Sequence, residues 1–90
     1  MHAFSDNTAR HRYEFTAPEG DSWAEYRDVG GVRVILHVET PVEARGRGYA
    51  SKLMEAIVGE ARSQGMRLRA SCAFAVAYFR RHPDTADIQA

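Results

Sequence analysis

The segment Arg45-Gly46-Arg47-Gly48-Tyr49-Ala50-Ser51 combines residue types that can bind an anionic group. An apolar, β-branched run at 32–38 precedes it, and an amphipathic helical pattern at 51–64 follows it. A strand, a glycine-rich turn and a helix in this order direct several backbone N–H groups, and the positive end of a helix dipole, at one point. Such a point binds phosphate or diphosphate, and glycine lets the anion approach the backbone closely. The sequence therefore predicts a phosphate site, to which the two arginines and Lys52 can add charge-assisted contacts.

Two common phosphate-binding motifs do not fit this turn. A Walker loop requires a Gly-Lys-Ser/Thr ending, which is missing here. A dinucleotide-binding fingerprint requires a third glycine or alanine where the chain has Ser51, and an acidic residue where it has Ser71 and Cys72. A turn that only reverses the chain, with arginines on a solvated basic surface, remains the alternative interpretation.

Three side chains outside the turn can take part in proton or group transfer. His37 and Glu39 are two residues apart on a predicted strand, so they project from the same face, and either can serve as a base. Cys72 stands just before a predicted short helix, whose N-terminus favours a thiolate nucleophile. The alternatives are a hydrogen-bonded sheet histidine, a surface glutamate and a small buried cysteine.

Hydrophobic alternation predicts the strands that lead to the turn. Three strands, at 11–16, 22–27 and 32–38, are expected to form an antiparallel meander. Turn-forming residues separate them at 17–21 and at 28–31.

The rest of the chain predicts a helix, a strand and a second helix. The first helix begins between 48 and 51 and ends at Gly65, and a fourth strand follows at 66–71. A strand, a helix and a strand in this order imply a right-handed crossover and a parallel pair. A short helix at 74–81 stops before a proline, and the tail is expected to hold a short strand near Ile88. The predicted fold class is α/β: a mixed, mostly antiparallel sheet with a central strand-turn-helix-strand unit and a second short helix.

The composition is that of one small domain over residues 1–90, with residues 1–9 expected to be flexible. The formal net charge is zero and the pI is near 6.9, which argues against a dedicated nucleic-acid binder. No apolar run approaches the ~20 residues of a membrane span, and no metal is expected. Cys72 is the single cysteine, so an intramolecular disulfide cannot form and a reducing, cytoplasmic location is expected.

The pattern Arg45-x-x-Gly48-x-Ala50 resembles the acetyl-CoA diphosphate signature of the GCN5-related N-acetyltransferase (GNAT) superfamily, Gln/Arg-x-x-Gly-x-Gly/Ala. The wider run at 37–53 and the ending at 72–83 resemble a branch of small, single-domain GNAT-like proteins, the yjdJ type of N-acetyltransferase domain-containing proteins. The resemblance covers about residues 10–88.

This resemblance implies an acetyl-CoA-dependent N-acetyltransferase that acts on an amine. In the superfamily, the strands before and after the helix splay apart, the pantetheine arm lies in the gap, and amides of the turn hold the diphosphate. Glu39 then lies where these enzymes often place a carboxylate base, and the branch carries at Cys72 a cysteine suspected of accepting the acetyl group. The implied acetyl-CoA-binding residues are Arg45, Gly46, Arg47, Gly48, Tyr49, Ala50 and Ser51.

The chain departs from the family pattern at two points. The family helix reads Asn-x-x-Ala-x-x-Phe-Tyr-x-Lys, and here Cys72 takes the Asn place, Tyr78 the Phe place and Phe79 the Tyr place. The phenol is therefore displaced by one residue, about 100° around a helix. The chain is also too short for the two N-terminal helices that help to build the acceptor pocket. An open site suits a macromolecular or peptide amine, or no acceptor at all, and it is compatible with a homodimer. Whether the acceptor is a peptide, a protein or a small molecule stays open.

Three functions remain open from the sequence alone. The first is an N-acetyltransferase, and the second is a CoA- or acyl-CoA-binding module or adaptor without turnover. The third is a nucleic-acid contact protein that uses Arg45, Arg47, Arg67 and Arg69, which the neutral net charge makes the weakest of the three.

Overall fold

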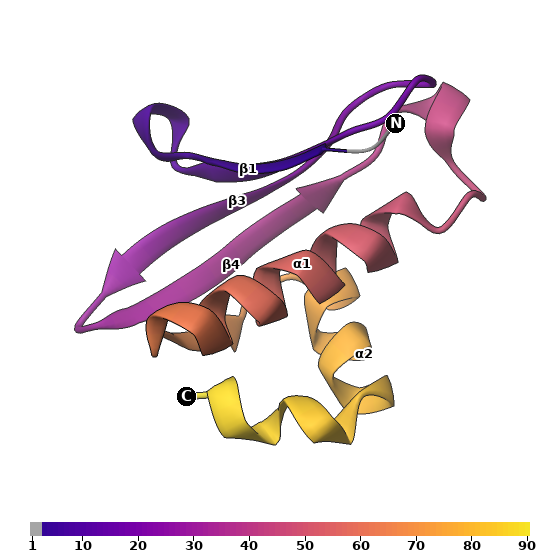
Figure 1. The fold of residues 1–90 in the computed structure, drawn as a ribbon. Helices are drawn as coiled ribbons and strands as arrows, with labels where there is room; N and C mark the ends of the chain where they lie inside the picture. Colours follow the sequence, from indigo (N-terminus) through magenta and orange to yellow (C-terminus); the bar gives the residue numbers. More distant parts are fainter. Residues whose placement is uncertain (1–2) are drawn as a thin grey trace.

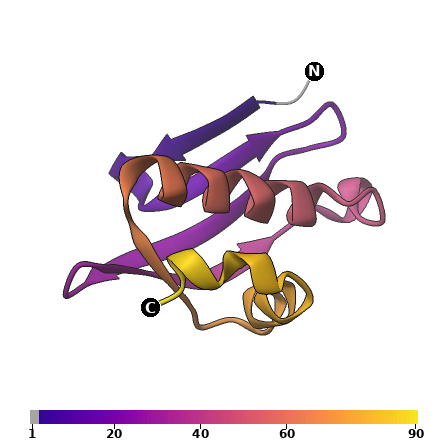
Figure 2. The ribbon, with the colours of Figure 1, turned by 60° about the horizontal axis from the view of Figure 1, so that its bottom comes forward.

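The computed structural model describes residues 3–90 as one sheet with the helices Tyr49–Gln64, Ala73–Arg81 and Pro83–Ile88 on one side (Figure 1, Figure 2). The strands lie in the order β1-β2-β3-β4-β5, with three antiparallel pairings and a parallel pairing of β4 with β5. This confirms the predicted α/β class and the parallel pair. The elements are β1 (Ala3–Asn7), η1 (Thr8–Arg10), β2 (Arg12–Thr16), β3 (Ser22–Val29), β4 (Val32–Glu39), η2 (Val42–Ala44), α1 (Tyr49–Gln64), β5 (Arg67–Ala70), α2 (Ala73–Arg81) and η3 (Pro83–Ile88).

Helix α1 packs an apolar stripe against the sheet. Its buried residues recur at the three- and four-residue spacing of one helix face, and Tyr13 and Phe15 of β2 belong to the same core cluster. Gly65 ends the helix in the left-handed conformation, with φ of 65°, as the sequence predicts. None of the helices within residues 3–90 combines the length and the apolar composition needed to cross a bilayer. The buried residues of α1 are Tyr49, Leu53, Met54, Ile57, Val58 and Ala61.

The two ends of the chain differ from the sequence-based expectation. Ala3–Asn7, expected to belong to a flexible lead-in, forms β1 and pairs with β2. Met1 and His2, the start of that lead-in, lie outside the described residues. The prediction of a strand near Ile88 is wrong, because that segment is the 3₁₀ helix η3. Among the described residues, one isolated bridge, from Leu68 to Gln89, follows it.

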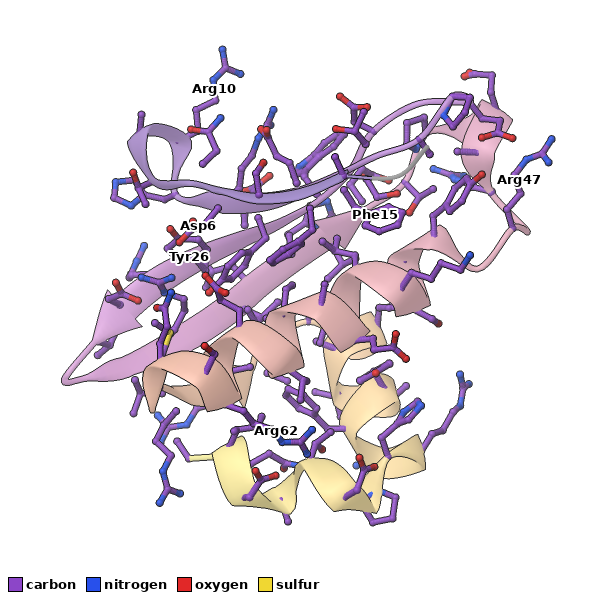
Figure 3. The ribbon with its side chains drawn as sticks, viewed as in Figure 1. Asp6, Arg10, Phe15, Tyr26, Arg47 and Arg62 are labelled. Atoms are coloured by element: carbon purple, nitrogen blue, oxygen red, sulfur yellow. The ribbon has the colours of Figure 1, made fainter. Side chains whose placement is uncertain are left out.

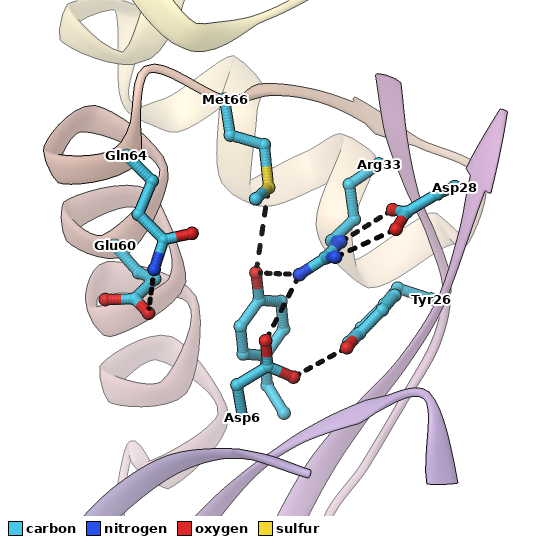
Figure 4. Close-up of polar contacts among 8 residues, drawn as sticks. Asp6, Tyr26, Asp28, Arg33, Glu60, Gln64 and Met66 are labelled. Atoms are coloured by element: carbon cyan, nitrogen blue, oxygen red, sulfur yellow. Dashed lines mark hydrogen bonds and ion pairs between the residues drawn. The ribbon is translucent and has the colours of Figure 1, made fainter. Parts of the chain in front are cut away.

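A polar cluster explains why β1 joins the sheet (Figure 4). The guanidinium of Arg33 makes a two-point ion pair with Asp28, at 2.7 and 2.9 Å, and donates to the Tyr13 hydroxyl at 2.9 Å. It also lies 3.3 Å from Asp6 of β1, which accepts a 2.6 Å hydrogen bond from Tyr26. The same guanidinium lies over the Tyr26 ring, 3.9 Å from its centroid. Charged and phenolic groups from four strands are thus satisfied together, and no periodicity in the sequence indicates this.

Strand β4 leaves β5 part of the way along its length. The register places Tyr26 opposite Ile35 and Glu25 opposite His37, so Leu36 is an extra residue in β4, as in a β-bulge. Pairing with β5 ends where Ala70 lies opposite Ile35, followed by the bond from Ser71 N–H to the Ile35 carbonyl at 2.9 Å. Among the described residues, the last four positions of β4 therefore have no strand beside them on that side. Strand β4 continues past the end of β5 at the place where the resemblance implies that the two strands splay apart.

Candidate functional site

The glycine-rich turn owes its shape to two left-handed backbone positions. Gly46 has φ of 81° and Gly48 has φ of 78°, and a Cβ added at either would meet nothing within 4 Å. Backbone conformation, more than close packing, therefore requires glycine here. Helix α1 opens with the bond from Lys52 N–H to the Gly48 carbonyl at 3.0 Å. The N–H groups of Ala50 and Ser51 lie before that first bond, outside the i→i−4 ladder of the helix.

A cavity of about 210 Å³ lies at this helix end. Its lining includes Arg45, Gly46 and residues 48–51, which are all of the predicted binding residues except Arg47. Thr40 at the end of β4, Ala44 of η2 and Phe74 in the first turn of α2 complete it. The structure thus gathers the predicted turn around one hollow, at the positive end of the 16-residue helix α1. Such a hollow fits an anionic group held by backbone N–H donors.

Arg47 contacts the loop between β2 and β3. Its guanidinium lies 3.4 Å from Glu19, and its side chain projects from the outer side of the turn (Figure 3). Tyr49 donates a 2.7 Å hydrogen bond to the same carboxylate, and this bond is the main reason why the pKa of the Tyr49 phenol is raised. Glu19 is not among the predicted site residues, because it stands 30 positions from Tyr49 in a segment whose sequence indicates only a turn.

His37 and Glu39 form a hydrogen-bonded pair on the sheet face opposite α1. Nε2 of His37 lies 3.2 Å from one Glu39 oxygen, and the Thr40 N–H donates to the other at 3.3 Å. The hydrogen bond from His37 is the largest cause that lowers the pKa of Glu39, with smaller contributions from the Thr40 amide and the Arg45 charge. An ionised carboxylate only accepts hydrogen bonds, so we assign the proton to Nε2 and leave Nδ1 of His37 as an acceptor. The two side chains are 52% and 36% exposed, so solvent reaches both.

Arg45 reaches this pair from the turn. Its Nε donates to the Thr40 carbonyl at 2.9 Å, and its Nη2 lies 3.4 Å from Glu39. Arg45, a basic residue predicted to bind phosphate, thus contacts a carbonyl and a carboxylate of the β4 end in this structure.

Cys72 does not join His37 and Glu39. It is the N-cap of α2, where its sulfur accepts a 3.4 Å hydrogen bond from the Ala75 N–H, and it packs against the core cluster. His37 lies on the opposite face of the sheet, because its register partner is the exposed Glu25 and the neighbouring pair includes the buried Ala24. The described contacts thus give Cys72 a structural function.

Tyr78 is a packing residue in this structure. It is 6% exposed and its ring stacks on that of His82, 4.0 Å between centroids. Burial is the main reason why the pKa of its phenol is raised. Phe79, at the family's tyrosine place, is also buried. Neither ring lines the cavity at the turn.

Three residues that line the cavity were not among the predicted site residues: Thr40, Ala44 and Phe74. Phe74 is an exposed aromatic residue at the start of α2, at 37% exposure, and an aromatic side chain on the polar side of a short helix is the signal that could have found it. Within residues 3–90, no group of three or more His, Cys, Asp or Glu side chains is placed to hold a metal ion.

Comparison with known proteins gives a consistent result. The family model described as GCN5-related N-acetyl-transferase matches residues 12–88. No curated protein sequence gives a significant match. Among solved structures, the chain is similar to the solution structure of a GCN5-like protein from Staphylococcus aureus, a proposed N-acetyltransferase. The TM-score is 0.70 at 22% identity, over 98% of this chain and 87% of that one, so this likeness concerns the fold.

Proposed function

Because the chain belongs to the GCN5-related N-acetyl-transferase family, we propose that it binds acetyl-CoA at the turn of residues 45–51 and transfers the acetyl group to an amine. The observation that carries the proposal is the cavity of about 210 Å³ at the N-terminus of α1, lined by every residue of that turn except Arg47. Backbone N–H groups there suit the diphosphate of CoA. When bound, acetyl-CoA supplies an acyl group activated as a thioester.

His37 is the proposed general base. Its Nδ1 is left as the acceptor because Glu39 holds Nε2–H, at 3.2 Å. The lowered pKa of Glu39 makes that carboxylate a poor base near neutral pH, so its proposed task is to orient the imidazole. The sequence left Glu39 and His37 as alternatives, and this geometry favours His37.

The proposed acceptor is an amine on a peptide or protein. Support comes from the sheet face that carries His37 and Glu39, because no helix formed by residues 3–90 covers it (Figure 2). A small-molecule amine, and pairing of two copies of the chain, are further possibilities that the same assays address. The single cysteine supports a reducing, cytoplasmic location.

A CoA-binding module without turnover is the second candidate. It is favoured by one observation: His37, Glu39 and Cys72 do not line the cavity at the turn. The sequence also predicts that Cys72 carries a covalent acetyl group during transfer. The N-cap hydrogen bond to the Cys72 sulfur offers a structural function for this residue as the alternative.

The experiment that separates these functions measures CoA release with a panel of peptide and small-molecule amines. An N-acetyltransferase shows release that depends on the amine and drops about 10²-fold or more in H37A, because general-base catalysis contributes that much. E39Q is expected to reduce this CoA release less than H37A does. E43Q, at an exposed residue of η2, serves as the control and should release CoA as wild type does. Binding of acetyl-CoA without amine-dependent release would support the module. Mass spectrometry of Cys72 and of C72A after incubation tests for the transferred acetyl group.

A further inference from the structure

Arg45 is the one described side chain that both lines the cavity at the turn and contacts Glu39. Its guanidinium uses two separate donors: Nε bonds to the Thr40 carbonyl at 2.9 Å, and Nη2 reaches Glu39 at 3.4 Å. The second oxygen of Glu39 accepts from His37 at 3.2 Å. A continuous series of polar contacts therefore runs from the turn, through the end of β4, to the imidazole.

The geometry of Arg45 argues against a phosphate ligand. A guanidinium that binds a diphosphate presents its paired N–H donors to phosphate oxygens. Here the Nε edge and Nη2 are directed at a carbonyl and a carboxylate of β4. The backbone conformation agrees, because Arg45 is extended, with φ of −70° and ψ of 152°, and its N–H bonds back to Val42. The backbone amides of the turn remain as the anion donors.

We propose that Arg45 is a positioning residue that holds Glu39, and through it His37, in place while the backbone of the turn holds the diphosphate. This proposal rests on the function proposed above for the same site. Arg45 clamps the end of β4 by the Thr40 carbonyl, and it fixes one Glu39 oxygen so that the other faces the imidazole.

The charged groups around the pair explain why such a clamp is needed. Glu25 of β3 lies directly opposite His37, and Trp23, opposite Glu39, donates to Glu25 at 3.2 Å. Glu25 is therefore a second carboxylate at the register position facing His37, while the contact that Nε2 makes in this structure is with Glu39. Among the lysines and arginines that the structure describes, Arg45 is the one that contacts Glu39, so it holds this carboxylate beside His37.

The test compares R45Q and R45K with R10Q, which removes the same charge at an exposed residue of η1 that is remote in the fold (Figure 3). In R45Q we expect kcat to fall about 2- to 5-fold, the range for a partly exposed pair, with the KM for acetyl-CoA within twofold of wild type. R45K keeps the charge but lacks the two-donor geometry, so its kcat should lie between that of R45Q and that of wild type. R10Q should match wild type. A large rise in KM with kcat unchanged would overturn the proposal, because it would identify Arg45 as a phosphate ligand. Unchanged kinetic constants would overturn it too.

Two further measurements do not depend on turnover. In R45Q, NMR titration should show the pKa of the Glu39 carboxyl rising toward its ordinary value, whereas R47Q, at the other arginine of the turn, leaves the Glu39 titration as in wild type. The Kd for CoA should change less than twofold in R45Q. If wild type binds CoA but releases no CoA from acetyl-CoA with any amine, the proposed catalysis fails. The Glu39 titration and the CoA affinity then still decide the role of Arg45. Loss of CoA affinity with an unchanged Glu39 titration would contradict that role.

Discussion

The hydroxyl of Tyr49 lies 2.7 Å from a carboxylate oxygen of Glu19, which ties the first residue of α1 to the loop between β2 and β3. Arg47 reaches the other oxygen of the same carboxylate at 3.4 Å. The Tyr49 ring also packs near Phe15 of β2, with 6.0 Å between centroids. The turn is therefore held against the sheet by an acidic side chain, which opposes the binding of an anion while it fixes the helix end.

Substitution E19Q is expected to tighten CoA binding. Loss of the carboxylate charge leaves Arg47 without that counter-charge, so affinity should rise about 2- to 5-fold at low salt and less at high salt. Calorimetric titrations at two salt concentrations measure this, with D21N, an exposed residue of the same loop, as the control. An equal gain in D21N, or a loss of affinity in E19Q, would contradict the prediction.

Glycine substitutions should separate backbone conformation from helix propensity. Gly48 has φ of 78°, so G48A should cost about 1–2 kcal/mol of unfolding free energy. Gly59 lies inside α1 with open space at its Cβ position, so G59A should add about 0.5–1 kcal/mol. Denaturant unfolding of both variants tests the pair. Equal effects at the two positions would show that the left-handed turn is absent in solution.

The sequence was sufficient for the elements whose patterns are local. The alternation at Leu68, the αL cap at Gly65 and the turn before α1 were all predicted from neighbouring residues, and the structure has them. β1 was not predicted, because it depends on Arg33 meeting acids and phenols from three other strands. The same reason hid Glu19 from the site. Interactions between residues distant in the chain leave no periodicity to detect.

The ion pair of Arg33 with Asp28 should make stability depend on pH in a defined direction. Hydrogen bonding from Arg33 is the main cause that lowers the pKa of Asp28 below its ordinary 3.8. A carboxyl with a lowered folded-state pKa stabilises the protein above its unfolded pKa, and this contribution is lost as pH falls through the folded pKa. At pH 7 the free energy of unfolding of wild type should therefore exceed that of D28N. The difference should be under about 1 kcal/mol, because Asp28 is more than half exposed.

The control for this pH dependence is E43Q, an exposed residue away from the cluster. Thermal unfolding at pH 7 and at pH 2 should show the D28N deficit only at the higher pH. A deficit that persists undiminished at pH 2 would mean that the Asp28 charge is not its source.

Substitution Y78F is expected to leave turnover within twofold of wild type. The phenol is buried, stacks on His82 and lies outside the cavity at the turn, so it is not placed to protonate a leaving thiolate. Steady-state CoA release with the best amine acceptor measures this. A fall of tenfold or more in kcat, with an unchanged melting temperature, would restore Tyr78 as a general acid.

The central claim is that the backbone at the start of α1 binds the diphosphate of acetyl-CoA. The most direct measurement is an amide chemical-shift titration of the 15N-labelled protein with CoA, acetyl-CoA and ATP. We expect the N–H resonances of residues 46–51 to shift together and saturably with both CoA ligands, at lower concentrations than with ATP. Saturable shifts elsewhere with this turn unaffected, or an absence of saturable binding by CoA, would contradict the claim.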